Sequence, residues 1–339
     1  MHVLVVGGTG FIGRCIVRQL VDAGCEVTVV HRGRTSAPLP PPPAVSEVLA
    51  DRAKLAGVLG SLPRPVDAVV DTLLLVEADA AALLQELRGR VPRLVVLSSG
   101  DVYRNYDGLR GLDEEPNDPR PLTEAAPLRT RLYPYRDQAP GADDWSYHYD
   151  KLLIERVVLA ATQPAGTVLR LPMVYGPFDA QRRLLPYLQR MEAKRPAILL
   201  EVGQSSWRVS RGYVEDVAAA VALAARDPRA AGQTYNVGEP EPLSERRWVE
   251  TIGDLVGWRG PVLEAPSGEM PGSLGLDWRY HLALDTGKIR RELGFREPVG
   301  RLEGLRRTIE WDRANPPASG PVVDYAREDA WLRRAGVFK

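Results

Sequence analysis

Tyr147 and Lys151 carry the first chemical signal in this sequence, because a spacing of four residues brings two side chains to one face of a helix. A nearby ammonium group favours tyrosinate and lowers the pKa of the phenol. Such a tyrosine can pass a proton to or from an alcohol oxygen while a hydride moves at the attached carbon. Tyr149 competes by position, but Leu153 stands where it would need a lysine. The spacing therefore predicts a helix over 147–161 with Tyr147 as the acid/base.

A serine and an aspartate follow the run 94–97, which is predicted to be a strand. Ligands of parallel α/β sheets bind outside the carboxyl ends of the strands. Ser99 stands at that end, and its hydroxyl can hydrogen-bond the same alcohol oxygen as Tyr147. Asp101 is a candidate acid/base for an elimination reaction. The sequence thus predicts a catalytic set of Ser99, Tyr147 and Lys151.

A glycine-rich turn, Gly7-Gly8-Thr9-Gly10-Phe11-Ile12-Gly13, separates a predicted strand at 3–6 from a predicted helix at 11–23. Glycine permits a tight turn and lets the backbone approach a pyrophosphate, which the helix N-terminus stabilises. We assign the binding of a dinucleotide to Gly7, Gly10, Phe11, Ile12 and Gly13. A tight strand-to-helix turn without a ligand is the alternative.

The end of the second predicted strand, 26–30, bears on which dinucleotide binds. NAD-binding folds usually have an acid there for the ribose 2′-hydroxyl. This chain has His31-Arg32-Gly33-Arg34 instead, and an arginine fork can pair with a 2′-phosphate. We therefore expect NADP(H) to be favoured over NAD(H), with Arg32 and Arg34 as cofactor residues; the alternative is a solvated loop. Asp51 and Arg52, which open the next helix, are expected at the adenine end.

Strand-like and helix-like stretches alternate through the first half of the chain, which predicts a parallel sheet with helices on both faces. The fold class is α/β: a Rossmann-type doubly wound parallel sheet with a smaller mixed α/β C-terminal substrate domain. A proline-rich stretch at 35–45 is expected to be a surface loop. A second irregular stretch, 104–144, has the length of a lid or binding loop. The predicted elements are strands at 66–70 and 167–171 and helices at 51–60, 76–88, 214–226 and 244–256.

Composition narrows the function classes. The 339 residues carry 44 Lys plus Arg and 44 Asp plus Glu, a formal net charge of +0, which gives no sign of a nucleic-acid or membrane partner. Two cysteines are too few for a disulfide framework, so we expect a cytoplasmic protein. Four scattered histidines show no zinc-site spacing, and no metal is expected.

These motifs together resemble the extended short-chain dehydrogenase/reductase family, in its NAD-dependent epimerase/dehydratase branch. The resemblance spans nearly the whole chain. It implies that Ser99 is the catalytic Ser/Thr, that Tyr147 is the acid/base, and that Lys151 also holds the nicotinamide ribose. It further implies a homodimer and a small-molecule substrate. The other segments that carry it are 170–177, 213–218, 235–238 and 288–294.

Domain boundaries and binding residues follow from the same resemblance. Residues 1–174 plus about 212–238 are expected to bind NAD(P), and about 175–211 with 239–339 to bind substrate. Leu171 and Pro172 are assigned to the cofactor. The candidates for substrate contact are Ser99, Met173, Arg208 and Arg211.

Two departures from the family pattern affect the predicted substrate. Met173 stands where nucleotide-sugar members usually carry Asn, and Gly100-Asp101 stands where sugar dehydratases often have Asp-Glu. We therefore favour an oxidoreductase acting on a carbonyl or secondary alcohol of a small polar substrate, sugar-like ones included. One alternative is an epimerase or dehydratase of a sugar or nucleotide sugar with tightly bound NAD(P). The other is a non-catalytic dinucleotide-sensing or RNA-associated protein on the same fold.

Overall fold

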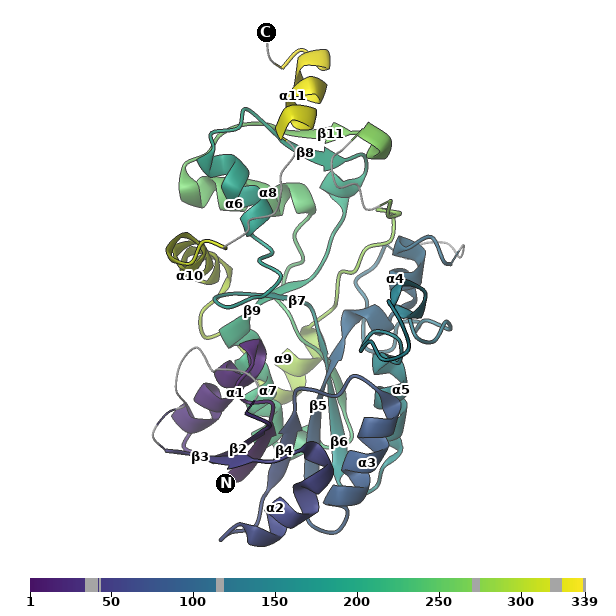
Figure 1. The fold of residues 1–339 in the computed structure, drawn as a ribbon, viewed down its shortest axis with the longest axis vertical. Helices are drawn as coiled ribbons and strands as arrows, with labels where there is room; N and C mark the ends of the chain where they lie inside the picture. The colour runs from purple at the N-terminus through teal and green to yellow at the C-terminus, as the bar shows by residue number, and fades with distance from the viewer. Residues whose placement is uncertain (34–41, 43, 114–118, 270–274, 318–324, 338–339) are drawn as a thin grey trace.

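Seven parallel strands form the central sheet of the computed structural model, which describes residues 1–33, 42, 44–113, 119–269, 275–317 and 325–337. Their order across the sheet is β3-β2-β1-β4-β5-β6-β10; Figure 1 labels β3, β2, β4, β5 and β6 of this sheet. This sheet confirms the predicted Rossmann-type α/β fold. The strands are β1 (His2–Val6), β2 (Glu26–His31), β3 (Val45–Leu49), β4 (Ala68–Asp71), β5 (Arg93–Ser99), β6 (Ala165–Leu171) and β10 (Thr234–Asn236).

Helices cover both faces of the sheet because both faces of its central strands are apolar. In β1 the alternation is clear: Val3 and Val5 belong to one buried cluster and Leu4 and Val6 to another. The first cluster is completed by α1 (Phe11–Asp22) and α7 (Val214–Arg226). The second is completed by α2 (Leu55–Ser61), α3 (Glu77–Leu87) and α5 (Lys151–Ala160), which Figure 1 shows side by side.

A smaller part of the molecule stands beyond the carboxyl ends of the strands (Figure 1). The chain enters it directly from β6, because β7 (Met173–Tyr175) begins two residues after Leu171 and pairs in parallel with β9 (Arg211–Tyr213). A second parallel pair, β8 (Ile198–Glu201) with β11 (Val262–Ala265), lies further out. The helices of the remaining chain are α4 (Arg104–Leu109), α6 (Leu185–Glu192), α8 (Glu245–Val256), α9 (Gly287–Leu293), α10 (Arg301–Ala314) and α11 (Tyr325–Arg334).

The predicted elements of the first half are confirmed, apart from small shifts at their ends. Sequence reasoning missed the edge strand β3, which begins at Val45, the last residue of the predicted 35–45 loop. Residues 35–41 and 43 of that stretch lie outside the described residues. Residues 104–113 and 119–144, the described part of the second irregular stretch, are irregular as predicted, except for α4 and a 3-10 turn at Arg136–Gln138. Among the described residues, no helix has the length and apolar composition that crossing a membrane requires.

The predicted helix start at Tyr147 is wrong. Helix α5 begins at Lys151, because the carboxylate of Asp150 accepts hydrogen bonds from the N–H groups of Leu152 and Leu153, at 2.9 and 3.4 Å. An aspartate in this position is an N-cap, which satisfies backbone donors that have no partner inside the helix. Tyr147 therefore lies in the turn before the helix.

Candidate active site

The glycine-rich turn after β1 is built as the sequence predicts. Gly7 has φ +84°, and a Cβ there would lie 2.6 Å from Cγ of Leu73, two residues after the end of β4. A Cβ on Gly13 would overlap the carbonyl oxygen of Gly7, so only glycine lets the first turn of α1 pack against the turn. Gly10 differs, because its Cβ would meet only the Gly7 oxygen, at 3.8 Å. Neither the fold nor the backbone at Gly10 requires a glycine.

The difference between Gly10 and the other two glycines, Gly7 and Gly13, bears on whether the turn fits a dinucleotide. Gly10 is the N-cap of α1, with φ −80° and ψ −178°, a conformation open to any residue. Phe11 and Ile12 follow as the half-buried first residues of the helix. The positive end of the α1 dipole and its unpaired N–H groups favour a phosphate at this point. The turn is therefore a cradle that a side chain at Gly10 would fill, which fits the pyrophosphate of a dinucleotide.

A cation, Arg32, and an anion, Glu47, both lie near the end of β2. Arg32 is exposed, as a residue that binds a 2′-phosphate would be, while Arg34 lies outside the described residues. Nε2 of His31 lies 2.9 Å from a carboxylate oxygen of Glu47, which comes from the neighbouring edge strand β3. Sequence reasoning found no acid after β2, because this carboxylate arrives from a strand that it did not predict.

Arg52 is held between two carboxylates rather than standing free at the adenine end. It lies 3.2 Å from Asp71 and 2.8 Å from Asp79. Asp71 ends β4 and is fully buried, and this burial raises the pKa of its carboxyl. Asp51 is exposed, and its side chain accepts a hydrogen bond from the N–H of Ala53. Asp71, which pairs with Val6 just before the glycine-rich turn, and Asp79, which binds Arg52, are polar groups that sequence reasoning did not single out.

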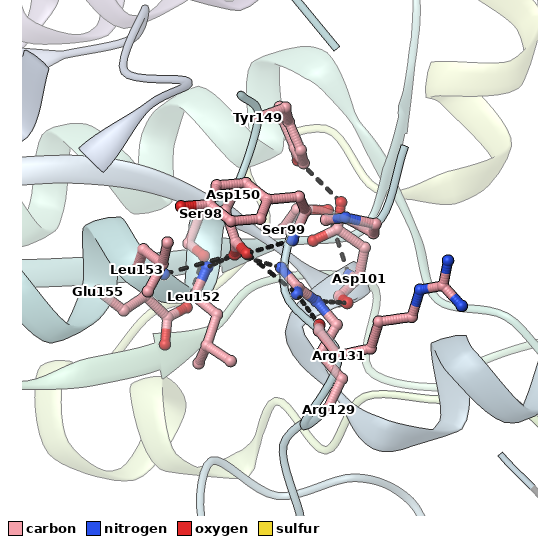
Figure 2. A network of polar contacts seen from close by, with 12 residues as sticks. Ser98, Ser99, Asp101, Arg129, Arg131, Tyr149, Asp150, Leu152, Leu153 and Glu155 are labelled. Atoms are coloured by element: carbon pink, nitrogen blue, oxygen red, sulfur yellow. Dashed lines mark hydrogen bonds and ion pairs between the residues drawn. The ribbon is translucent and has the colours of Figure 1, made fainter. Parts of the chain in front are cut away.

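Ser99 and Asp101 meet at the carboxyl end of β5, as predicted. The hydroxyl of Ser99 is half-buried and accepts a hydrogen bond from the N–H of Asp101 at 3.2 Å. Asp101 is only 6% exposed, and burial raises the pKa of its carboxyl. Its Oδ2 accepts hydrogen bonds from the hydroxyls of Tyr149, at 2.8 Å, and Tyr135, at 3.1 Å. Figure 2 shows Tyr149 directed at Asp101.

The prediction that Tyr147 and Lys151 share one face of a helix is wrong, since α5 starts only at Lys151. The Tyr147 ring is half-buried, packs against His148 at 4.9 Å and carries the guanidinium of Arg136 at 4.8 Å. The ring of Tyr149, by contrast, has its centroid 5.8 Å from Nζ of Lys151. The structure thus brings Tyr149, which the spacing argument set aside, to Ser99 and Lys151.

Lys151 is buried at the start of α5. Its ammonium group donates to the backbone carbonyls of Leu74 and of Leu97, the latter at 2.9 Å. Burial lowers the pKa of Lys151 to about 8. An ammonium has three donors, so one remains for a further acceptor such as a ribose hydroxyl.

A buried ion pair fixes the segment before α5. The guanidinium of Arg129, 1% exposed, pairs with the carboxylate of Asp150, which has no exposed surface. Arg129 Nε also donates to the backbone carbonyl of Asp101, at 3.1 Å, and Asp150 accepts from the N–H of Tyr133 at 2.7 Å. Figure 2 shows this network reaching from Asp101 to the first turn of α5. It holds the site's backbone in place.

The residues assigned to the substrate side lie where β6 leads into β7. Leu171 is buried opposite Ser99 in the register of β5 and β6, and Pro172 is half-buried. Met173 is 38% exposed and stands opposite Arg211 in the β7–β9 pair. Arg211, however, is buried and paired with the carboxylate of Glu245. Arg208 is exposed, with Nη1 3.3 Å from the carbonyl of Pro242.

The chain is similar in sequence to known proteins. A sequence model described as the NAD dependent epimerase/dehydratase family matches residues 3–238. The 2-alkyl-3-oxoalkanoate reductase of Stenotrophomonas maltophilia is 30% identical, and the match covers 76% of each chain. The dTDP-glucose 4,6-dehydratase of Shigella flexneri is 26% identical, with 93% of each chain covered. An uncharacterized protein of Sinorhizobium fredii is 25% identical over 52% of this chain, and the chain spans only 56% of that relative.

Solved structures share the fold over almost the whole chain. The crystal structure of UDP-glucose 4-epimerase from Thermus thermophilus in complex with NAD has a TM-score of 0.64 and 25% sequence identity. The similarity covers 92% of this chain and 99% of that chain.

Proposed function

Because the chain belongs to the NAD dependent epimerase/dehydratase family, we propose that it is an oxidoreductase acting on a carbonyl or secondary alcohol. Its substrate is small and polar, sugar-like compounds included. The observation that carries this proposal is the meeting of Ser99, Asp101, Tyr149 and Lys151 at the carboxyl end of β5. Ligands of this kind of sheet bind at that edge. The reductase among the relatives supports the same class of reaction.

The chain's own residues bind the dinucleotide, orient the substrate and transfer protons. A bound NAD(P)H supplies the hydride. Gly7, Gly10 and Gly13 hold its pyrophosphate, and the free donor of Lys151 binds its nicotinamide ribose. Ser99 hydrogen-bonds the substrate oxygen, and a tyrosine exchanges a proton with that oxygen. The sequence spacing favours Tyr147 for this step, and the contacts with Asp101 favour Tyr149.

The preferred dinucleotide depends on two opposed charges at the end of β2. Arg32 supports NADP(H), because a guanidinium can pair with a 2′-phosphate. Glu47 opposes it, because a carboxylate repels a phosphate and accepts from a ribose hydroxyl. We retain NADP(H) as the proposed cofactor. Dissociation constants for NADPH and NADH, measured on Arg32→Ala and Glu47→Gln, test it: the first must weaken NADPH selectively, and the second must strengthen it.

An epimerase or dehydratase with tightly bound NAD(P) is the second candidate. Asp101 favours it, because burial raises the pKa of this carboxyl, and a carboxyl with a raised pKa is a better proton acceptor and donor for a carbon acid than an ordinary one. The dTDP-glucose 4,6-dehydratase relative supports the same class. A non-catalytic dinucleotide sensor is the third candidate, and in a sensor Ser99→Ala would change no measurable turnover.

One extraction experiment separates these candidates. Freshly purified protein is denatured, and any released dinucleotide is identified and quantified by mass spectrometry. Near-stoichiometric retained dinucleotide favours the epimerase or dehydratase, which recycles its cofactor in place. An empty protein that binds NADPH better than NADH supports the exchanging reductase. A protein that binds neither refutes both enzyme proposals.

Substrate binding is proposed for about 175–211 and 239–339, the part of the chain that stands beyond the carboxyl ends of the strands (Figure 1). Residues 1–174 with about 212–238 form the proposed dinucleotide-binding unit. We also propose a homodimer that packs through α5 and the helix beside it, α3. Sedimentation equilibrium tests the dimer, and a monomer at all concentrations would refute it.

A further inference from the structure

A carboxylate and two tyrosines form a buried cluster that the catalytic spacing did not predict. Tyr149 and Asp101 are each 6% exposed, and their hydrogen bond is 2.8 Å long. Tyr135 donates to the same oxygen, Oδ2. Among the described residues, the other oxygen of Asp101, Oδ1, is buried without any hydrogen-bond partner. A buried carboxylate with a bare oxygen is costly, so the protonated acid is favoured.

The cations nearby do not offset this cost directly. Arg129 directs its guanidinium at Asp150, and only its Nε reaches Asp101, at the backbone carbonyl. Lys151 donates to two backbone carbonyls, so its ammonium is also engaged elsewhere. The groups that face the Asp101 carboxyl are thus two phenols, Tyr149 and Tyr135, with two cations at longer range. Desolvation outweighs their stabilisation of the charged form and raises the pKa of Asp101.

Aromatic packing orients Tyr149 toward this carboxyl. Its ring centroid lies 5.0 Å from that of Tyr135 and 5.7 Å from that of Trp145, both of which come from the segment 104–149. Ser99 is close enough for its hydroxyl to favour the ionised form of the Tyr149 phenol, although burial still raises the pKa of that phenol well above its usual value. Tyr149 is therefore a neutral proton donor with a second acid behind it. Tyr147 lies apart from these groups, against Arg136 and His148.

We propose that Tyr149, and not Tyr147, exchanges the proton with the substrate oxygen, and that Asp101 resupplies it. This inference rests on the proposed oxidoreductase function. In the reductive direction the Tyr149 O–H bond breaks as an O–H bond forms on the substrate oxygen. When the Tyr149 hydroxyl turns from Asp101 to the substrate oxygen, the protonated Oδ2 of Asp101 becomes the donor to the Tyr149 oxygen. Its proton passes along this reversed hydrogen bond, which leaves Asp101 as a carboxylate. The electron pair comes from the reduced nicotinamide dinucleotide, and in the oxidative direction every transfer reverses.

The first test needs neither substrate nor cofactor. Infrared difference spectra between the unmodified protein and Asp101→Asn isolate the band of the protonated Asp101 carboxyl, which is then titrated with pH. The Tyr149 hydroxyl stabilises the carboxylate, so Tyr149→Phe must move the midpoint of this titration to higher pH and shift the band. Tyr147→Phe must leave both unchanged. Absence of the band at every pH at which the protein stays folded, or equal effects of the two variants, overturns the pairing.

The second test measures proton transfer in the reaction. NADPH and NADH oxidation is followed with glyceraldehyde as the probe, and NADP⁺ and NAD⁺ reduction is followed with UDP-glucose. Tyr149→Phe must lower kcat by roughly 10²–10⁴-fold, the usual contribution of a positioned acid/base, with the dinucleotide Kd unchanged. A loss of this size in Tyr147→Phe alone refutes the inference. Failure of the unmodified protein to bind either dinucleotide refutes the proposed function instead, and the infrared result then still decides whether the Tyr149–Asp101 pair exists.

Discussion

Two glycines of the turn after β1 are expected to differ in what they contribute, and alanine substitutions separate the two contributions. A methyl group at Gly13 would overlap the backbone of Gly7, which cannot move aside as a flexible side chain can. Overpacking of this kind costs about 1–3 kcal/mol, so Gly13→Ala must lower the free energy of unfolding by that amount. A methyl group at Gly10 meets only one atom, at 3.8 Å.

The stability of Gly10→Ala is expected to be close to that of the unmodified protein. Alanine is a poorer N-cap than glycine, but it also loses less backbone entropy on folding, and the two effects oppose each other at roughly 0.5–1 kcal/mol each. Dinucleotide binding must nevertheless weaken, because the methyl group keeps the pyrophosphate from the helix N-terminus. Losing one charge-assisted hydrogen bond costs about 1.5–3 kcal/mol, or roughly 10- to 150-fold in Kd.

Thermal or urea unfolding and calorimetric titration with NADPH and NADH measure the two quantities on the same samples. Gly57→Ala is the matched control, since Gly57 lies inside α2 with nothing near its Cβ position. That variant must be more stable, by up to about 1 kcal/mol, with unchanged binding. The reasoning is refuted if Gly10→Ala binds both dinucleotides as tightly as the unmodified protein does.

Three further predictions concern buried charges. Burial lowers the pKa of Lys151 to about 8, so its ammonium is present below that pH and lost above it. Dinucleotide affinity must therefore fall as pH rises through about 8, and an affinity that stays constant up to pH 10 would contradict this. Arg129→Met leaves the Asp150 carboxylate buried without its cation, so the unfolding free energy must drop by about 3–5 kcal/mol in urea titrations, a loss that an unperturbed urea midpoint would exclude. Arg170 pairs with Glu155 in the same way, at 2.7 Å, and Arg170→Met must lower the unfolding free energy by a similar amount. The double variant with Glu155→Gln must recover part of this loss, and equal stability of the single and double variants would count against the pairing.

Helices with a complete apolar stripe could be predicted from the sequence. The helix at 214–226 and the glycine-to-helix turn at residues 7–13 both depend on local spacing, and both are confirmed. The predicted start of α5 is wrong, and the reason for this error is also local. Asp150 stands directly before Lys151-Leu152, and an aspartate before an apolar run is an N-cap signal, which the four-residue spacing of Tyr147 and Lys151 overrode.

Other parts of the site depend on contacts between distant segments. Glu47 reaches His31 from an edge strand of only five residues, three of them exposed, whose pattern is weak. Arg129 reaches Asp150 across 21 residues of irregular chain. Tyr149 meets Asp101 only because this irregular chain turns back over the end of β5. No local periodicity encodes such pairings, since they depend on how the loop packs.

Because Asp150 contacts both the segment 104–149 and helix α5, these two parts of the chain depend on each other structurally. The Asp150 carboxylate both starts the helix that carries Lys151 and binds Arg129, which lies within the long segment before the helix. In a chimaera that takes 104–149 from a relative, the new segment must therefore supply a cation in place of Arg129. Without that cation, the carboxylate of Asp150 at the start of α5 would be buried without a partner.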